Sequence, residues 1–336
     1  MSANFSQGVG GLKILFVHNA KTRFVQMDLD ILQSTHNVVE LAFAPSPHYF
    51  ATLAREIKAC DVIYGWWVSA HLLPAVLLAK RFGKKIIIAG GDYDVIYKIN
   101  HGWLRDKGRY WLGHLLFRLI DAFVVFSEYS LAKTLEHKHI RPSKVSVIPI
   151  GFRDIAKKSS RVKRPMILTV GTVWRTELYR KGLEMFARVS REMPDVEFIL
   201  AGRWMDDAIE FLRQINDANI KYTGFVPDTT LWQMMSEAKV YTQLSSHEGF
   251  GCALAEAMLF ECVPVVTERG AIPEVVGEEG IYVPFQDVPR TVQAIRAVLA
   301  QDGTVGSRAR QRILARFPFE KRRNELLELV DNIATG

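Results

Sequence analysis

The chain alternates short apolar runs with longer amphipathic segments. In its first half, runs rich in Val and Ile occupy residues 12–18, 37–43, 61–67, 84–91, 122–128 and 145–151. These runs lack polar alternation, which is typical of strands buried on both faces. Helical patterns lie between them, for example at residues 51–60 and 72–83. This order of elements indicates a parallel sheet whose strands are joined by helices.

The same pattern begins again after a polar, basic stretch at residues 152–164, which fits a linker. Further apolar runs cover residues 165–171, 196–202, 220–225, 239–245, 263–268 and 280–285. We therefore predict an α/β chain with two Rossmann-like, doubly wound parallel-sheet domains, at residues 1–152 and 153–317. Ligands bind beyond the carboxyl ends of the strands in such sheets. The loops at those ends are expected to line a cleft between the domains.

Length and composition agree with two globular domains. The 336 residues are 49% hydrophobic and 24% charged. No apolar run approaches the ~18–20 residues that span a bilayer. The first 18 residues lack a basic segment leading into an apolar one, so we predict no signal peptide and a cytoplasmic location. The cysteines, Cys60, Cys252 and Cys262, form no Cys-x-x-Cys pair, which argues against a disulfide framework or a zinc site.

Positive charge is concentrated in the first half of the chain. Residues 1–158 contain 21 Lys and Arg against 12 Asp and Glu, a net charge of +9, and the remainder contains 22 against 24, a net charge of −2. This asymmetry favours an anionic partner for the first half, such as a membrane surface, a nucleic acid or a phosphorylated substrate. A scattered solubilising charge explains it equally well.

The stretch SSHEGFGCALAEAM, residues 245–258, carries candidate donor-binding chemistry. Gly249 and Gly251 let a ligand approach the backbone, and the helix predicted to begin near Gly251 offers an anion site. A sugar nucleotide fits this stretch, since its diphosphate binds amides while its hydroxyls bind carboxylates. Glu248 is assigned to the sugar and Glu256 to the ribose. The alternative is that both glutamates belong to a solvated helix face.

A second cluster follows the run at residues 165–171. Gly171 ends the predicted strand, and Arg175 and Lys181 are cations close to a predicted helix start. These side chains are suited to neutralising a diphosphate leaving group. Arg180 is a further, lower-ranked candidate for the same role. The alternative is an exposed basic loop.

Candidate residues in the first half also follow predicted strands. Gly90 and Gly91 leave room beside Asp92, whose carboxylate is suited to orienting a sugar hydroxyl or accepting a proton. The alternative is a tight turn capped by the aspartate. His18 and Asn19 follow the first strand on the acceptor side, although a histidine at such a place is more often a hydrogen-bonded structural residue.

Taken together, these residues resemble retaining glycosyltransferase family 4, the glycosyl transferases group 1, which has the GT-B fold. The most specific part is the stretch HEGFGCALAEAMLFECVPVVTERGAIPEVVG at residues 247–277. The resemblance implies that Glu248 contacts the donor sugar, that Glu256 binds ribose, and that Lys181 binds phosphate. It also implies that the loop of Gly249, Phe250 and Gly251, with Cys252 after it, meets the donor.

The resemblance further implies that a final helix, at about residues 318–336, packs back on the N-terminal domain. Three positions depart from the family pattern. Thr172 stands where the family arginine usually follows the glycine, which leaves Arg175 and Arg180 both open for that role. Residues 18–24, HNAKTRF, contain no glycine. Asp92 takes the place of a histidine that many relatives carry.

The implied reaction transfers a sugar from a UDP-, GDP- or ADP-sugar to an acceptor hydroxyl with retention of configuration. We expect no metal and no cofactor beyond this co-substrate. The acceptor is left open as a glycan, a lipid-linked molecule or a small molecule. Aromatic and basic residues are mixed at 97–121, which suits contact with the cytoplasmic face of a membrane, or a helix with aromatic residues in the core.

Other classes of protein share parts of this sequence pattern. An NAD-dependent oxidoreductase is disfavoured because no Gly-x-Gly-x-x-Gly follows the first strand of either half. No recognition motif supports nucleic-acid binding. A GT-B nucleotide-sugar epimerase and a non-catalytic nucleotide-sugar-binding module remain as alternatives.

Overall fold

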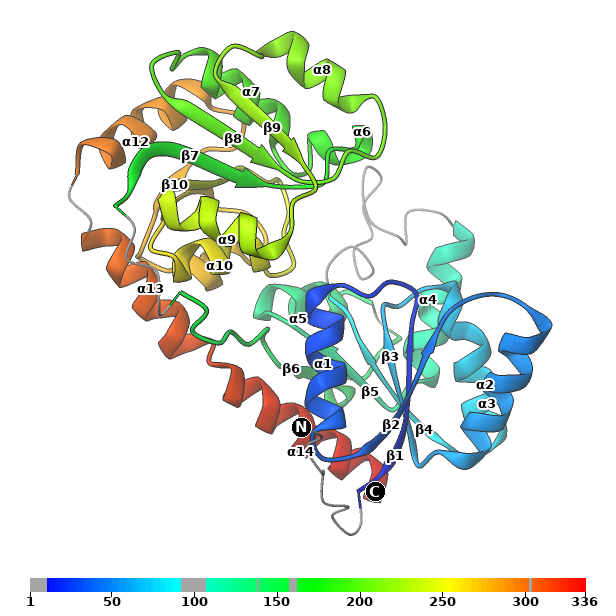
Figure 1. The fold of residues 1–336 in the computed structure, drawn as a ribbon. Helices are drawn as coiled ribbons and strands as arrows, with labels where there is room; N and C mark the ends of the chain where they lie inside the picture. Colours follow the sequence, from blue (N-terminus) through cyan, green and yellow to red (C-terminus); the bar gives the residue numbers. More distant parts are fainter. Residues whose placement is uncertain (1–10, 92–106, 138, 157–161, 302–303) are drawn as a thin grey trace, which may run out of the picture. The chain divides into compact units, whose positions relative to one another are not determined.

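The computed structural model describes residues 11–91, 107–137, 139–156, 162–301 and 304–336. The chain forms two compact units (Figure 1). Unit 1 contains Met1–Pro149 and Glu320–Gly336, and unit 2 contains Ile150–Phe319. Unit 1 is therefore assembled from two separate stretches of the chain.

Unit 1 is built on a parallel sheet with the strand order β2-β1-β3-β4-β5-β6. Its strands are β1 Lys13–His18, β2 Asn37–Ala42, β3 Val62–Trp66, β4 Lys85–Ala89, β5 Ala122–Val125 and β6 Val145–Val147. Its helices are α1 Arg23–Gln33, α2 Pro47–Ala59, α3 Leu73–Arg81, α4 Lys107–Leu119, α5 Glu128–Leu135 and α14 Phe319–Thr335, with short 3₁₀ turns η1 Ala70–Leu72 and η3 Pro142–Lys144.

Unit 2 contains a second parallel sheet, with the strand order β12-β11-β10-β7-β8-β9. Its strands are β7 Arg164–Val170, β8 Glu197–Ala201, β9 Ile220–Gly224, β10 Ala238–Gln243, β11 Val263–Thr267 and β12 Ile281–Val283. Its helices are α6 Arg175–Leu178, α7 Leu183–Arg191, α8 Ala208–Ile215, α9 Asp228–Glu237, α10 Cys252–Leu259, α11 Ile272–Val276, α12 Val288–Ala300 and α13 Thr304–Arg316.

The predicted pair of doubly wound parallel sheets is confirmed. Each apolar run of the sequence contains a strand, although several runs, such as residues 84–91, extend past the strand into the following loop. Burial on both faces holds for central strands such as β3, whose residues are all buried. It fails for β2, β6, β9 and β12, which are partly exposed because each lies at an edge of its sheet and has one neighbouring strand.

Alternate residues of β1 are buried against different layers of helices. Leu15 and Val17 belong to the core cluster formed with α2, α3 and α4. Phe16 points to the opposite face and stacks on Tyr64, with ring centroids 5.5 Å apart. In Figure 1 this second face is the one covered by α1 and α14. A strand with helices on both faces has no solvated side, which is why its sequence shows no polar alternation.

A buried ion pair joins α14 to α1 within unit 1. Arg322 Nε and Nη2 each lie 2.9 Å from an oxygen of the Asp28 carboxylate, and both side chains are 0% exposed. Tyr64 Oη also donates to Asp28, at 2.8 Å. Arg322 Nη1 donates to the carbonyl oxygens of Ile148, at 2.7 Å, and Pro149, at 3.0 Å. The hydrogen bonds of both charged groups are therefore satisfied, as a buried ion pair requires.

Removing one member of this pair should destabilise the protein strongly. Arg322→Met leaves the Asp28 carboxylate buried without its cation, and we expect the free energy of unfolding to fall by about 3–5 kcal/mol in urea denaturation. Asp28→Leu combined with Arg322→Met removes both charges and should recover part of this loss. The control is Arg323→Met, which alters a side chain 36% exposed on the same helix and should cost at most about 0.5 kcal/mol. Equal losses for Arg322→Met and Arg323→Met would contradict this interpretation.

Candidate active site

The two clusters predicted in the second half of the sequence follow neighbouring strands. β7 pairs directly with β10 in the middle of the sheet of unit 2. The chain leaves β7 toward β8 on one side and leaves β10 toward β11 on the other, so strand order reverses at this point. Ligands of doubly wound sheets bind beyond such a switch point. The loops after residues 170 and 243 are therefore the expected place for a ligand in unit 2.

The two loops are in close contact through a glycine. Gly182 directly precedes α7 and has φ +68°, a conformation that favours glycine. A β-carbon at this position would clash with the carbonyl oxygen of Leu244. The amide of Ser246 donates to the carbonyl oxygen of Arg180, at 2.8 Å. Only glycine allows this approach, and it places the residue before it, Lys181, next to the loop that follows β10.

Lys181 and Glu248 form an ion pair at this junction. The Lys181 ammonium lies 2.8 Å from Oε1 and 3.0 Å from Oε2 of Glu248. The Glu248 side chain is 5% exposed and the Lys181 side chain is 22% exposed. The carboxylate is thus held inside the protein and the ammonium is its more accessible partner. Sequence reasoning named both residues as site candidates but assigned them to different parts of the donor.

Two residues that were not predicted hold the Glu248 carboxylate in place. Gln243 Nε2 donates to Glu248 Oε1 at 2.8 Å, and Ser245 Oγ donates to the same oxygen at 2.7 Å. Gln243 also donates to Ser245 Oγ, at 2.8 Å. The signal for them was present, because both are polar residues at the end of a largely buried strand. Their two-residue spacing is that of side chains on one side of an extended chain.

The glycine turn leads directly into α10. Gly251 is the residue before the helix and has φ +98°, and Cys252 is the first helical residue. Phe250 is buried and packs against Phe152 and Phe317, with ring centroids 6.0 and 5.2 Å away. Its side chain therefore anchors the turn, which leaves the backbone of residues 249–251 as the part of the turn that a ligand can meet.

Both glutamates of the E-x7-E pattern lie within electrostatic range of one buried phenol. Glu256 is part of α10 and is partly buried. Burial raises the pKa of Tyr241 well above its ordinary value, and the charges of Glu248 and Glu256 raise it further. The simple alternative of a fully solvated helix face does not describe Glu248, whose carboxylate is enclosed.

The two arginines left open by the sequence occupy different environments. Arg180 is buried, pairs with Glu177, and has Nη1 3.4 Å from the carbonyl oxygen of His247. Arg175 begins α6 with its side chain 56% exposed and bonds to Asp207 at 2.8 Å. The lower-ranked Arg180 therefore lies beside the Glu248 loop. Gly171, at the end of β7, packs against α7.

In unit 1, the predicted acceptor-side residues lie at the ends of β1 and β4. His18 is buried and its Nε2 lies 2.8 Å from Glu40 Oε1, while Asn19 is exposed. Burial raises the pKa of Glu40, but hydrogen bonds from Lys21 and His18 outweigh this effect and the net shift is downward. His18 thus has the structural partner that its position suggested.

The glycine pair at the end of β4 is described only in part. Gly90 and Gly91 are buried, and Ser130 Oγ donates to the carbonyl oxygen of Gly91. Asp92, the candidate that follows them, lies outside the described residues.

Sequence reasoning overlooked Trp67, which follows β3. β3 and β1 flank the point at which strand order reverses in unit 1. Trp67 has φ +72°, which is strained for a residue with a side chain. Its ring is half-buried and lies edge-on to Phe24, with centroids 5.6 Å apart. The sequence signal for Trp67 was the pair of tryptophans at residues 66–67. Neighbouring residues of a strand point to opposite faces, so packing against one face accounts for only one of them.

Two aspartate pairs have the Asp-x-Asp spacing that can place two carboxylates on one metal. Asp28, of the pair with Asp30, is committed to Arg322 inside unit 1. The other pair, at residues 92 and 94, lies outside the described residues. Within the part of the chain that the structure describes, no group of three His, Cys, Asp or Glu side chains is placed to hold a metal ion.

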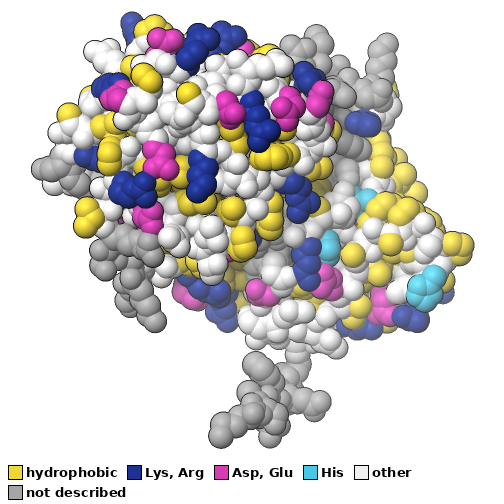
Figure 2. Space-filling model, turned by 45° about the horizontal axis from the view of Figure 1, so that its top comes forward, with side chains coloured by type: hydrophobic (Ala, Val, Ile, Leu, Met, Phe, Trp, Pro, Cys, Tyr) yellow, Lys and Arg dark blue, Asp and Glu magenta, His cyan; other side chains and the backbone are white. Residues whose placement is uncertain are grey.

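The aromatic and basic segment at 97–121 is described from residue 107. On α4, Phe117 is fully buried, whereas Trp111 is 65% exposed and Leu115 is 41% exposed. Core packing therefore accounts for Phe117 and leaves the other two unexplained. On the face drawn in Figure 2, basic and acidic side chains are intermingled. None of the helices in the described ranges combines the length and the hydrophobicity needed to cross a bilayer.

The chain is similar to known proteins over parts of its length. Residues 164–301 match the family model described as Glycosyl transferases group 1. The chain is 37% identical over 102 residues to O-antigen chain mannosyltransferase B of Escherichia coli, covering 29% of this chain and 25% of that protein. It is 30% identical over 134 residues to a phosphatidyl-myo-inositol mannosyltransferase of Mycolicibacterium smegmatis, covering 37% and 34%. The matched regions thus span less than half of these relatives' length.

Solved structures share the fold over nearly the whole chain. The Anabaena protein HepE, solved in complex with UDP-glucose, superposes with a TM-score of 0.80 at 17% identity, covering 96% of this chain and 100% of that one. Sucrose-phosphate synthase of Thermosynechococcus elongatus superposes with a TM-score of 0.76 at 17% identity, covering 96% and 99%. The predicted GT-B fold is confirmed, as is the resemblance to the family.

The contact at Gly182 provides a test of how the site is built. Gly182→Ala adds a β-carbon that clashes with the Leu244 carbonyl oxygen, and we expect a loss of more than about 3 kcal/mol in the free energy of unfolding. The control is Gly83→Ala, where φ is +65° but a β-carbon would meet nothing within 4 Å. Its cost should be that of the backbone conformation alone, about 1–2 kcal/mol. Equal costs in urea denaturation would show that the close approach of the two loops is not required.

Proposed function

We propose that this chain, whose residues 164–301 match the glycosyl transferases group 1, is a retaining glycosyltransferase. Its donor is a UDP-, GDP- or ADP-sugar, and its acceptor is a hydroxyl group on a glycan, a lipid-linked molecule or a small molecule. The observation that carries this proposal is the Lys181–Glu248 ion pair, placed at the switch point of unit 2 beside the glycine turn.

We assign different parts of the donor to the two charged groups and to the helix. The diphosphate is assigned to the amides of residues 249–252, where the start of α10 provides a favourable potential for an anion. Lys181 has three N–H groups, so it can keep its contact with Glu248 and also donate to a phosphate oxygen. Glu248 is held by Gln243 and Ser245 in one orientation, which suits a carboxylate that accepts hydrogen bonds from sugar hydroxyls. Glu256 is assigned to the ribose.

In the reaction, the bond between the anomeric carbon and the diphosphate oxygen breaks and the acceptor oxygen bonds to the same carbon. The acceptor proton passes to the leaving phosphate, which departs from the face that the acceptor attacks. Negative charge grows on the diphosphate during this step. The ammonium of Lys181 and the amides near α10 are suited to stabilise it, and each such group contributes about 2–4 kcal/mol.

Stabilisation by side chains and amides leads us to propose a reaction that needs no metal and no cofactor other than the donor. On the acceptor side we propose His18, Asn19, Gly90, Gly91 and Asp92. We add Trp67, which follows β3 with a strained backbone and whose ring lies against Phe24. We also propose a cytoplasmic enzyme that contacts the membrane surface, with a lipid-linked acceptor. The exposed Trp111 and Leu115 of α4 support the membrane contact.

Nucleotide binding tests this function directly. A thermal-shift screen with UDP, GDP, ADP and their sugars, without added metal, should show stabilisation by one base, of roughly 2.7 kcal/mol at ~100-fold its dissociation constant. Glu256→Ala should remove this shift, because it removes the ribose contact. Glu248→Ala should retain most of the shift and lose transfer of radiolabelled sugar.

The other outcomes of this screen separate the alternatives. Binding without transfer or donor turnover indicates a nucleotide-sugar-binding module, and interconversion of donor sugars without an acceptor indicates an epimerase. No shift with any nucleotide, in a sample shown to be folded, would contradict the proposal.

The structure also favours one of the two arginines. Arg180 lies beside the Glu248 loop and Arg175 pairs with Asp207 at the surface, so we expect Arg180→Ala to lower kcat about 10²-fold or more. Arg175→Ala, the control, should leave kcat within about twofold of the wild type. Melting temperatures measured on both variants separate a catalytic loss from unfolding. A larger loss of kcat in Arg175→Ala would reverse the assignment.

A further inference from the structure

A cationic pocket lies in unit 1, far along the sheet from the residues assigned to the acceptor. Its volume is about 430 Å³ and it is lined by Phe117, Arg118, His139, Ile140, Arg141 and Lys144. These residues come from the end of α4 and from the segment that precedes β6, so they surround the amino-terminal ends of β5 and β6. Gly90 and Gly91 follow the carboxyl end of β4 in the same parallel sheet. The pocket therefore lies at the opposite ends of the strands.

The lining of this pocket contains four basic side chains and no carboxylate. The carboxylate of Asp121, close in sequence to Arg118, is already bound by Lys80 Nζ, at 2.9 and 3.0 Å, and by the amide of Ile86, at 2.9 Å. Burial lowers the pKa of Lys144, and the positive charges of Lys80 and Arg141 lower it further, against the opposing effect of Asp121. Among the described residues, no carboxylate therefore lines the pocket beside these cations.

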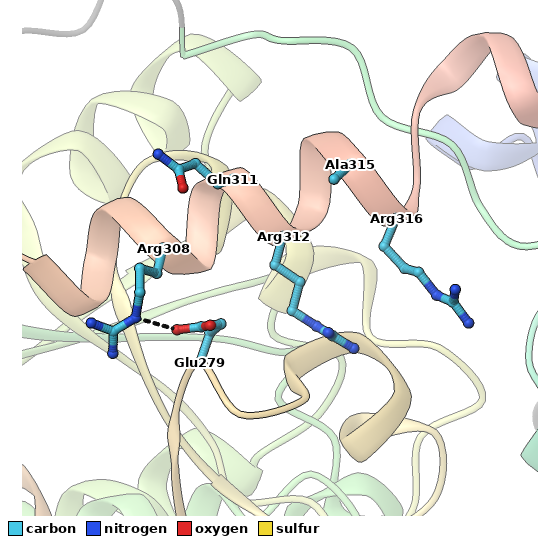
Figure 3. Close-up of a pocket in the computed structure, with 6 residues that line it drawn as sticks. All are labelled: Glu279, Arg308, Gln311, Arg312, Ala315 and Arg316. Carbon is cyan, nitrogen blue, oxygen red and sulfur yellow. Dashed lines mark hydrogen bonds and ion pairs between the residues drawn. The ribbon is translucent and has the colours of Figure 1, made fainter.

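A second pocket, in unit 2, contains a cluster of arginines that are largely bound by groups of the protein itself (Figure 3). It also measures about 430 Å³ and is lined by Arg308, Arg312 and Arg316. Arg308 Nε lies 2.8 Å from a carboxylate oxygen of Glu279. Arg312 donates to two backbone carbonyl oxygens, at 2.8 Å each. Two of the three guanidinium groups of this pocket thus form hydrogen bonds or an ion pair with other groups of the protein.

The guanidinium groups of the unit 1 pocket are placed differently. Within the described residues, no hydrogen bond or ion pair engages the side chain of Arg118 or Arg141. His139 packs edge-on against His114, with ring centroids 4.1 Å apart, which fixes the ring at the pocket. Lys144 donates to the carbonyl oxygen of Ile120, which holds its ammonium in place. Two fixed side chains and two adaptable guanidinium groups thus converge on one cavity.

We propose that this pocket binds an anion that carries a phosphoryl group. A guanidinium group donates two parallel hydrogen bonds to phosphate oxygens. A phosphate dianion can interact with several cations at once, whereas a carboxylate has a single negative charge. Two sources share this chemistry, a soluble phosphorylated molecule and the headgroup of an anionic lipid. Trp111 and Leu115 lie seven and three residues before Arg118 on α4, so they share its helix face, and this face is where a lipid would meet the protein.

The site is tested with the full chain and two matched double variants. Arg118→Ala with Arg141→Ala removes two guanidinium groups from the pocket, and Arg308→Ala with Arg316→Ala removes the same charge from the pocket of Figure 3. Inorganic pyrophosphate is titrated into each protein in a calorimeter at low salt. Each is also sedimented with vesicles of equal phosphatidylglycerol and phosphatidylcholine, and with vesicles of phosphatidylcholine alone. Circular dichroism confirms that each variant is folded.

We expect the Arg118/Arg141 variant to lose about tenfold or more in affinity, and the Arg308/Arg316 variant to bind as the wild type does. A loss confined to pyrophosphate identifies a soluble phosphorylated ligand, and a loss that includes the phosphatidylglycerol vesicles identifies a lipid headgroup. Equal binding by both variants, or an equal loss in both, would overturn the proposal. Sugar transfer is not part of this readout, so the result does not depend on the proposed function.

Discussion

The approach of Gly182 to the carbonyl oxygen of Leu244 is the contact on which the candidate site depends. It joins the loop after β7 to the loop after β10 at the point where strand order reverses. Lys181 precedes the glycine and Glu248 lies in the second loop, so their side chains meet only if the two backbones come this close. The ion pair therefore depends on a position that has no β-carbon. Because the two loops can approach there, an ammonium and a carboxylate from distant parts of the sequence can meet.

The environment of Glu248 explains how a carboxylate is held in one orientation while it is nearly buried. A buried carboxylate is costly unless it is paired and hydrogen-bonded, and here an ammonium, an amide and a hydroxyl group all reach it. Since Lys181 is the more exposed partner, a ligand would meet the cation first. The ion pair therefore presents a site of small net charge, and positive charge at a bound diphosphate comes from Lys181 together with the start of α10.

The fold could be predicted from the sequence because both sheets are parallel and largely buried. Continuous apolar runs separated by helical patterns leave few other architectures. The exceptions, β2, β6, β9 and β12, are edge strands whose residues are partly exposed. The site was only partly accessible to the same reasoning. Glycines and charged residues after strands mark its loops, but spacing alone cannot tell which side chains share a partner. Gln243 and Ser245 were missed for that reason, and the distinction between Arg180 and Arg175 needed the positions of Glu177 and Asp207. Trp67 was missed because its strain is a property of the backbone.

The discontinuity of unit 1 has a consequence for the order in which the protein is made. Residues 150–319 leave the ribosome before residues 320–336, so unit 2 can complete its sheet while unit 1 still lacks α14. During that interval Asp28 has no Arg322, and the face of the first sheet that α14 covers is open to solvent. A nascent chain at this stage therefore exposes the apolar surface around Asp28, a carboxylate that is buried in the folded protein. Chaperones bind exposed apolar surface of this kind, and it promotes aggregation. Unit 1 is thus completed by a helix that is synthesised after unit 2.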